Sequence, residues 1–106
     1  MNILLDECVD WRFGRLLPNH AVSAVFREGW SGTKNGALLA LAATKFDVFL
    51  TVDQNLSYQQ SVEGLDIAIL VMESKGTRLK ELEPLAPKVL TALEEVQVGL
   101  LTRVGA

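Results

Sequence analysis

The 106-residue chain has few of the features that mark secreted or membrane proteins. It has a single cysteine, Cys8, so no internal disulfide can form, which fits a reducing compartment. No apolar run approaches the ~18–20 residues that are needed to cross a bilayer. The first residues lack a basic region, and Asp6 interrupts the first apolar stretch, so we expect no signal peptide. These absences predict a cytoplasmic protein that does not bind membranes.

Basic residues are also scarce. Ten lysines and arginines against 13 aspartates and glutamates give a net charge of −3. An indiscriminate nucleic-acid-binding protein needs a basic face, so the composition argues against that class. It does not argue against an enzyme that contacts a nucleic acid through a bound divalent metal, because the metal supplies the positive charge.

The length and composition predict one domain that spans residues 1–106, because 49% of the residues are hydrophobic and can fill a core. The sequence contains no repeat, low-complexity run or linker. The apolar strands and a leucine-rich last helix would permit a homodimer.

Apolar runs without polar alternation predict buried strands, and helical spacing of apolar residues predicts helices between them. The predicted strands are 1–5, 20–26, 47–52, 66–72 and an edge strand at 100–104. The predicted helices are 8–17, 36–45, 79–82 and 85–98, and we expect 54–64 to be a loop or loosely helical. Alternating strands and helices predict an α/β fold, a three-layer α/β/α sandwich with a mainly parallel sheet of 4–5 strands.

Acidic residues follow two of the predicted strands. Asp6 and Glu7 come directly after the first strand, and Asp53 follows the third, two residues after Thr51. The carboxyl ends of parallel strands share one edge of a sheet, so we expect the three carboxylates to converge there, where they need a counter-cation. Oxygen ligands favour Mg²⁺ or Mn²⁺, so the pattern predicts a metal site at Asp6 and Asp53. Thr51 is placed to bond a metal-bound water or a phosphate.

Each of these residues also has a simpler interpretation. Asp6 can cap the next helix, and Glu7 can complement the dipole of that helix. Asp53 can be an acid at the start of a turn. Asn35 and Asn55 can ligate a metal through their amide oxygens, or can serve as a helix cap and a turn residue.

Three motifs resemble a known family. They are I-L-L-D-E at 3–7, N-G-x-L-L-A-L-A at 35–42 and L-T-V-D-x-N-L at 50–56. In order and spacing they are similar to those of short PIN-like proteins catalogued as a domain of unknown function, which are relatives of the VapC-type toxin ribonucleases. The resemblance covers roughly residues 1–70.

The resemblance implies a PIN-like sandwich with an acidic Mg²⁺ or Mn²⁺ site that cleaves RNA phosphodiester bonds. It also implies the toxin role in a toxin–antitoxin pair, with a small antitoxin protein as partner. Asp6 matches the metal-binding acid of the first strand, Asp53 matches the acid after the third, and Thr51 takes the usual hydroxyl position. Many PIN-like proteins have acids where this chain has Asn35 and Asn55, and amides add no charge, so we expect weaker metal binding.

Three functions from different classes therefore remain open. The first is a metal-dependent ribonuclease in which Glu7 and Asn35 assist the two metal-binding acids. The second is a catalytically degenerate binding module held by a small protein partner. The third, ranked last, is a phospho-accepting receiver domain, which needs a lysine at the end of the fifth strand, where residues 100–104 offer only Arg103.

Two further groups of side chains have alternative interpretations. Arg12, Arg15 and Arg27 form either a rim for phosphate groups or ordinary solvated charges. Trp11 and Trp30 provide either an aromatic surface for a base or a partner, or, for Trp11, the edge of the core.

Overall fold

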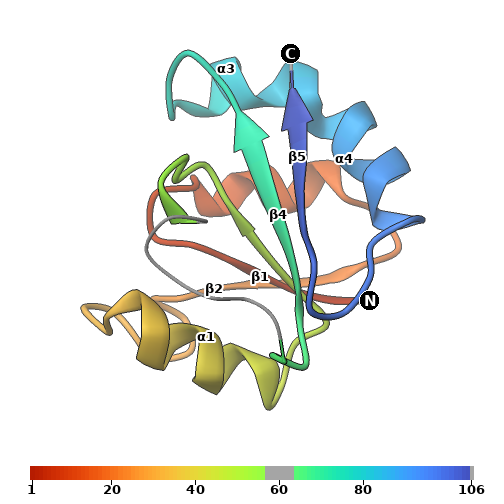
Figure 1. Cartoon of the computed structure of the whole chain (residues 1–106). Coiled ribbons are helices and arrows are strands. Elements are labelled where there is room, and N and C mark those ends of the chain that lie inside the picture. Colours follow the sequence, from red (N-terminus) through yellow and green to blue (C-terminus); the bar gives the residue numbers. More distant parts are fainter. Residues whose placement is uncertain (57–63, 106) are drawn as a thin grey trace.

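The computed structural model describes residues 1–56 and 64–105, and its centre is a parallel sheet of five strands (Figure 1). The strand order is β2-β1-β3-β4-β5, and every neighbouring pair is parallel. The strands are β1 (Asn2–Leu5), β2 (Ala21–Ala24), β3 (Val48–Thr51), β4 (Ala68–Glu73) and β5 (Leu101–Gly105). All five lie within or next to the predicted apolar runs, and β5 is an edge strand as expected, so the predicted strands are confirmed.

Helices cover both faces of this sheet, which confirms the three-layer α/β/α sandwich (Figure 1). The helical elements are η1 (Trp11–Leu16), α1 (Asn35–Ala43), α3 (Leu79–Leu82), η2 (Glu83–Leu85) and α4 (Ala86–Leu93). Helix α4 is shorter than the predicted 85–98. Glu94 and Glu95 follow its last residue, and carboxylates at the negative end of the helix dipole oppose its continuation.

The predicted helix at 8–17 is wrong in type and extent, because η1 is a 3₁₀-helix of six residues. Asp10 caps it by accepting a hydrogen bond from the backbone N–H of Arg12 at 2.9 Å. Gly14 lies in its middle, where glycine weakens a helix but allows close packing. A Cβ atom at Gly14 would lie 2.8 Å from Cγ1 of Val22, so η1 rests directly on strand β2.

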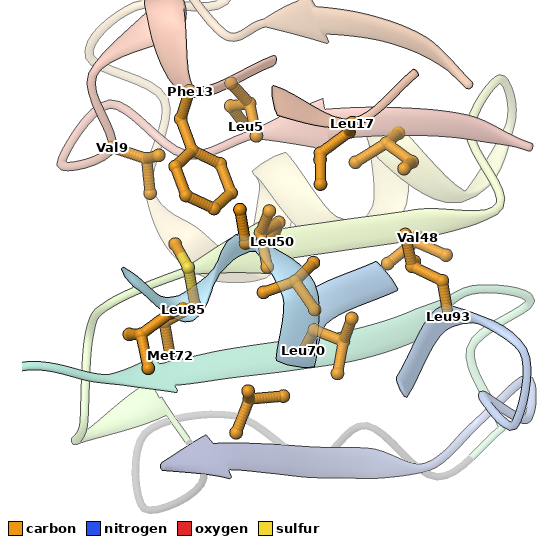
Figure 2. Packing of buried hydrophobic residues seen from close by; sticks show 14 of the residues in the cluster. Leu5, Val9, Phe13, Leu17, Val48, Leu50, Leu70, Met72, Leu85 and Leu93 are labelled. Carbon is orange, nitrogen blue, oxygen red and sulfur yellow. The ribbon is translucent and has the colours of Figure 1, made fainter. Parts of the chain in front are cut away.

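The two faces of the sheet carry separate hydrophobic cores. Side chains alternate along each strand, so Ile3 and Leu5 point to one face while Leu4 points to the other. On the first face, Phe13 of η1 and the residues of α3 and α4 pack against β1, β3 and β4 (Figure 2). On the second face, Leu38 of α1 and its neighbours complete the core. Burial on both faces explains why the three central strands, β1, β3 and β4, have no polar alternation.

The strand order creates a topological switch point between β1 and β3. From β1 the chain crosses to β2 on one side of it, and it then returns to β3 on the other side. Ligands of open α/β sheets bind outside the carboxyl ends of the strands at such a point. Asp6 and Asp53 follow these two strands, so the topology places both acids at this position. Of the segment predicted as a loop, residues 57–63 lie outside the described part of the chain.

Candidate functional site

Strands β1 and β3 remain paired up to the point where the acidic residues begin. Leu5 is in register with Leu50, and the backbone N–H of Asp6 donates to the carbonyl of Leu50 at 3.0 Å. Asp6 is therefore held at the edge of the sheet by a hydrogen bond to the neighbouring strand. Its backbone position does not depend on the loop that follows.

The Asp6 carboxylate is buried, with 9% of the residue exposed, and hydrogen bonds fix it. Oδ1 accepts from the backbone N–H of Glu7 at 2.8 Å, and Oδ2 accepts from the Thr51 hydroxyl at 2.7 Å. The Thr51 oxygen in turn accepts from the backbone N–H of Asp53 at 3.0 Å. One buried hydroxyl therefore joins the ends of β1 and β3 and sets the orientation of Asp6.

Asp53 is held less tightly than Asp6. It is partly exposed, and its Oδ1 accepts a hydrogen bond from the backbone N–H of Asn55 at 3.0 Å. This is the turn geometry that aspartate favours, so the predicted turn role of Asp53 is present together with its place in the site. With the described residues, the Asp53 side chain makes no second hydrogen bond, which leaves its other oxygen available to a ligand.

Glu7 points toward the loop that precedes α1. Its Oε1 accepts from the backbone N–H of Gly32 at 2.8 Å, and Gly32 has a φ of +82° that favours glycine. Asn35, the first residue of α1, follows this loop. The bond from Gly32 to Glu7 thus brings the start of α1 to the end of β1.

These residues surround a surface pocket of about 490 Å³, which we call the acidic pocket. Its lining includes Asp6, Glu7, Asp53 and Asn35, as well as Thr77 from the loop after β4. Thr51 lies beneath it, fully buried. Asn55 is exposed and contributes no lining among the described residues, so of the two predicted amides only Asn35 borders the pocket.

Cys8 adds a thiol to the same pocket. Its sulfur lies 3.5 Å from Oδ2 of Asp6 and 3.4 Å from the Thr51 hydroxyl oxygen. Desolvation of the sulfur raises the pKa of Cys8 above its usual value, although the hydrogen bond that the sulfur shares with Thr51 offsets part of this. At neutral pH the group is therefore a protonated thiol that can donate to Asp6, and it is a poor nucleophile.

The donors in the pocket fit a divalent metal only in part. In the described ranges 1–56 and 64–105, no three side chains of His, Cys, Asp or Glu group closely enough to hold a metal ion. A site enclosed entirely by protein ligands does not fit these residues. Mg²⁺, however, is commonly held by one or two carboxylates together with waters and substrate phosphates. Asp6 and Asp53 fit a metal bound in that way.

Gln54 is a structural residue of this region that sequence reasoning missed. Its Nε2 donates to the carbonyls of Val52 at 3.0 Å and Met72 at 2.6 Å, and its Oε1 accepts from Arg103 at 3.1 Å. Gln54 therefore ties the segment after β3 to both β4 and β5. No local sequence signal identifies it, because two of its partners are distant in the chain.

Comparison with protein-family models, with curated proteins and with solved structures finds no match to this chain. In the part of the chain that the structure describes, no helix has the length and apolar character needed to cross a membrane. The geometry of the acidic pocket and the sequence motifs around it are therefore the features that indicate a function.

Proposed function

We propose that this protein is a metal-dependent phosphodiesterase that cleaves RNA, with Mg²⁺ or Mn²⁺ held by Asp6 and Asp53. The observation that carries the proposal is the position of both carboxylates in one pocket at the topological switch point of the sheet. The resemblance of the three motifs to PIN-like ribonucleases supports RNA as the substrate. The role of toxin in a toxin–antitoxin pair remains a prediction from that resemblance.

Each residue of the pocket has a distinct part in this proposal. A bound metal would activate a water molecule and neutralise the charge that develops on the phosphate. Thr51 orients Asp6 through its hydrogen bond, so Asp6 would present its carboxylate to a metal in a fixed orientation. Asn35 lines the pocket and offers an amide oxygen or a donor to a phosphate. Glu7 assists by holding the Gly32 loop in place.

Two carboxylates make a weak metal site, and this has a measurable consequence. The remaining positions around the metal would be filled by waters and by oxygens of the substrate phosphate. We therefore expect Mn²⁺ to bind weakly to the protein alone and more tightly when an uncleavable RNA analogue is present. Calorimetric titration of Mn²⁺ with and without the analogue measures this difference.

The main test compares Asp53→Asn with a matched control. Asp66→Asn removes the same charge at an exposed position before β4, outside the pocket. We expect Asp53→Asn to reduce Mn²⁺-dependent cleavage of a single-stranded RNA by at least 100-fold and to abolish Mn²⁺ binding, because it removes one of two anionic ligands. Asp66→Asn should cleave like wild type. Equal, metal-independent cleavage by all three proteins would refute the proposal.

A second candidate is a degenerate binding module that a small protein partner holds. What favours it is that, among the described residues, no three His, Cys, Asp or Glu side chains group closely enough to hold a metal ion. The two candidates differ in their response to a restored acid. If the site is a weakened nuclease, Asn35→Asp should raise Mn²⁺ affinity, whereas Asn55→Asp should not, because only Asn35 borders the pocket. No metal binding by either variant would favour the binding module.

The phospho-accepting function has less support. Arg103 donates to the side chain and the carbonyl of Gln54, so its guanidinium is bound by a neighbouring loop and does not replace the lysine of a receiver site. An unchanged intact mass after incubation with a small phosphodonor would exclude phosphorylation of Asp53.

A further inference from the structure

A basic and aromatic cluster lies beside the acidic pocket. The guanidinium carbons of Arg15 and Arg27 each lie 4.9 Å from the ring centroid of Trp11. Arg15 belongs to η1 and Arg27 follows β2, so the fold brings together two arginines from separate elements. Trp11 is 39% exposed, and both arginines are exposed to solvent. We call these three residues the Trp11 cluster.

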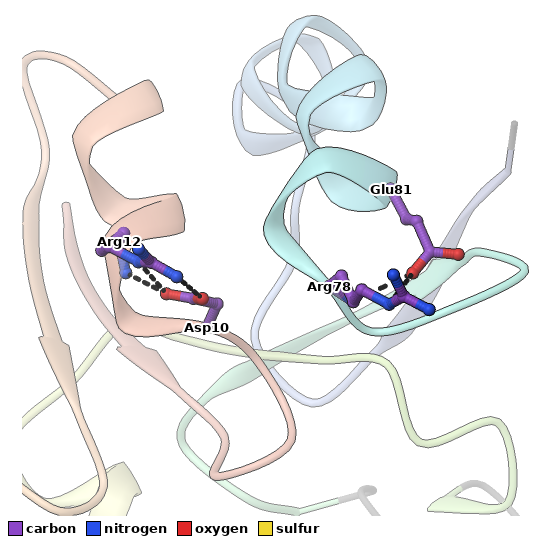
Figure 3. A network of polar contacts seen from close by, with 4 residues as sticks. All are labelled: Asp10, Arg12, Arg78 and Glu81. Carbon is purple, nitrogen blue, oxygen red and sulfur yellow. Dashed lines mark hydrogen bonds and ion pairs between the residues drawn. The ribbon is translucent and has the colours of Figure 1, made fainter.

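The acids near this cluster form their ion pairs with other cations, although Asp10 also attracts Arg15 electrostatically. Arg12, the third arginine of the region, pairs with Asp10 at 2.7 Å (Figure 3). Arg15 and Arg27, in contrast, form no ion pair with any residue that the structure describes. The Trp11 ring orients both guanidinium groups through cation–π contacts, which leave their N–H donors available. A protein of net charge −3 thus presents at one place two oriented cations that form no ion pair with the described residues.

The cluster opens onto the acidic pocket through a series of adjoining hollows. The first, of about 380 Å³, is lined by the Trp11 cluster together with residues of η1 and β2. The second, also about 380 Å³, has a lining that includes Trp11 and Phe26, the acids Asp6 and Glu7, and the ion pair of Asp10 and Arg12. Trp11 is thus common to the first two hollows, and Asp6 and Glu7 are common to the second and the acidic pocket. The three hollows are therefore neighbours on the surface, in order from the arginines to the ends of β1 and β3.

Phe26 provides a flat apolar surface in the second hollow. It is 53% exposed, and the Arg27 guanidinium lies 5.8 Å from its ring centroid. An exposed aromatic ring between cations and a candidate phosphate-cleaving site is the arrangement on which single-stranded bases stack.

We propose that the Trp11 cluster binds the backbone phosphates of single-stranded RNA and that Phe26 stacks on a base, so that the strand is guided into the acidic pocket. This inference rests on the proposed function for its choice of RNA. Guanidinium groups match phosphate geometry with two parallel hydrogen bonds, and stacking needs an exposed ring. A folded protein partner would instead need a central contact area depleted in charge, which this charged surface does not offer.

The test measures RNA binding without cleavage. A fluorescein-labelled 12-nucleotide single-stranded RNA is titrated with protein in EDTA, and anisotropy is recorded over a range of salt concentrations. We expect Arg15→Gln/Arg27→Gln to raise the Kd at least tenfold. The slope of log K against log salt should fall by about 1.4, since each phosphate contact on a single strand contributes about 0.7.

A control variant and a second test variant separate the contributions of the arginines, of net charge and of base stacking. Lys80→Gln/Lys88→Gln removes the same charge from exposed positions on α3 and α4, and its Kd should stay within about twofold of wild type. Phe26→Leu keeps an apolar side chain but removes the ring. It should weaken binding about fivefold or more without changing the salt slope, because stacking releases no counterions.

Three outcomes would overturn the inference. The first is equal RNA affinity of the arginine variant and the lysine control. The second is binding of a polyglutamate peptide of matching charge as tight as that of RNA, which would indicate an acidic protein as the partner. The third is an unchanged KM for RNA cleavage in Arg15→Gln/Arg27→Gln, which would leave the proposed function intact. Conversely, RNA binding that needs the arginines, in a wild type that cleaves no RNA with Mn²⁺, would refute the proposed function and support this inference.

Discussion

The ends of β1 and β3 each present an aspartate to the same pocket, but the structure holds the two side chains in different ways. Asp6 is buried and accepts hydrogen bonds from the Glu7 backbone and from Thr51, with the Cys8 sulfur nearby. Asp53 is partly exposed and accepts only from the backbone of Asn55 among the described residues. One carboxylate is fixed in place, and the other can adjust.

The difference follows from the energetics of burying charge. A buried carboxylate is costly unless donors surround it, and each donor also restricts its orientation. Asp6 therefore gains its fixed geometry from the same contacts that make its burial tolerable. Asp53 needs no such support because water reaches it. A pair of this kind suits a ligand that enters from solvent, since one acid is preorganised while the other can move to meet it.

Removing the Thr51 hydroxyl, which orients Asp6 but not the Asp53 carboxylate, should cause the largest loss of stability. Thr51→Val keeps the shape of the side chain but leaves Oδ2 of Asp6 without its short hydrogen bond and the Asp53 N–H without an acceptor. We expect the free energy of unfolding to fall by about 1–3 kcal/mol, the typical cost of unsatisfied buried groups. Urea denaturation measures this change.

The control for that experiment is Thr91→Val. The Thr91 hydroxyl donates to the carbonyl of Pro87 on the exposed surface of α4, where water can replace it. Its loss should change stability by less than about 0.5 kcal/mol. Equal effects of the two substitutions would mean that the hydroxyl between the strand ends has no special structural role.

Removing the Gln54 side chain, which anchors the segment after β3, should lower the free energy of unfolding by less than Thr51→Val does. Gln54→Ala removes two donations to the carbonyls of Val52 and Met72, at a site that is only partly buried. We expect a loss of about 1 kcal/mol in unfolding free energy. Gln97→Ala, at an exposed turn before β5, is the matched control and should stay within about 0.5 kcal/mol of wild type. If Gln54→Ala changes the unfolding free energy as little as Gln97→Ala does, contacts other than those of Gln54 hold the segment that carries Asp53.

Much of the fold is predictable from the sequence because its signals are local. The run from Ile3 to Leu5 has no polar alternation, and burial on both faces of the sheet explains it. Leu38 and Leu39 of α1 are buried against the opposite face of the sheet. The order of the strands has no such local signal, because it depends on crossovers between distant segments. The 3₁₀ form of η1 depends likewise on close packing of Gly14 against Val22 of β2.

The candidate site likewise has features that the sequence predicts and features that it does not. That Asp6 and Asp53 would meet was predictable, since both follow apolar strands that run parallel in one sheet. The direction of Glu7 toward Gly32 was not predictable, because the loop that supplies this donor is far along the chain. Nor does the sequence indicate which arginine is neutralised by an acid and which contacts Trp11 instead.

Asp10→Asn should have the smallest effect on stability and the strongest dependence on pH, because the Asp10 carboxylate forms an exposed ion pair with Arg12. The side-chain hydrogen bond from Arg12 holds the pKa of Asp10 at about 2, below its ordinary value of 3.8. The lower folded-state pKa means that the charged form stabilises the fold above pH 3.8, and that this contribution is lost as the pH falls through 2. Asp10→Asn keeps a residue that can cap η1 and removes only the charge.

We expect Asp10→Asn to lower the urea midpoint at pH 7 by less than Gln54→Ala does, because an ion pair at the surface is screened by water. The difference from wild type should shrink below pH 4 and also in 1 M salt. Arg12→Gln and the double variant complete a double-mutant cycle that isolates the pair. A variant as stable as wild type at every pH would show that Asp10 acts only as a cap, because asparagine keeps that role. Arg12 would then gain no stability from an ion pair, like Arg15 and Arg27, and the basic surface beside the acidic pocket would extend to η1 as a whole.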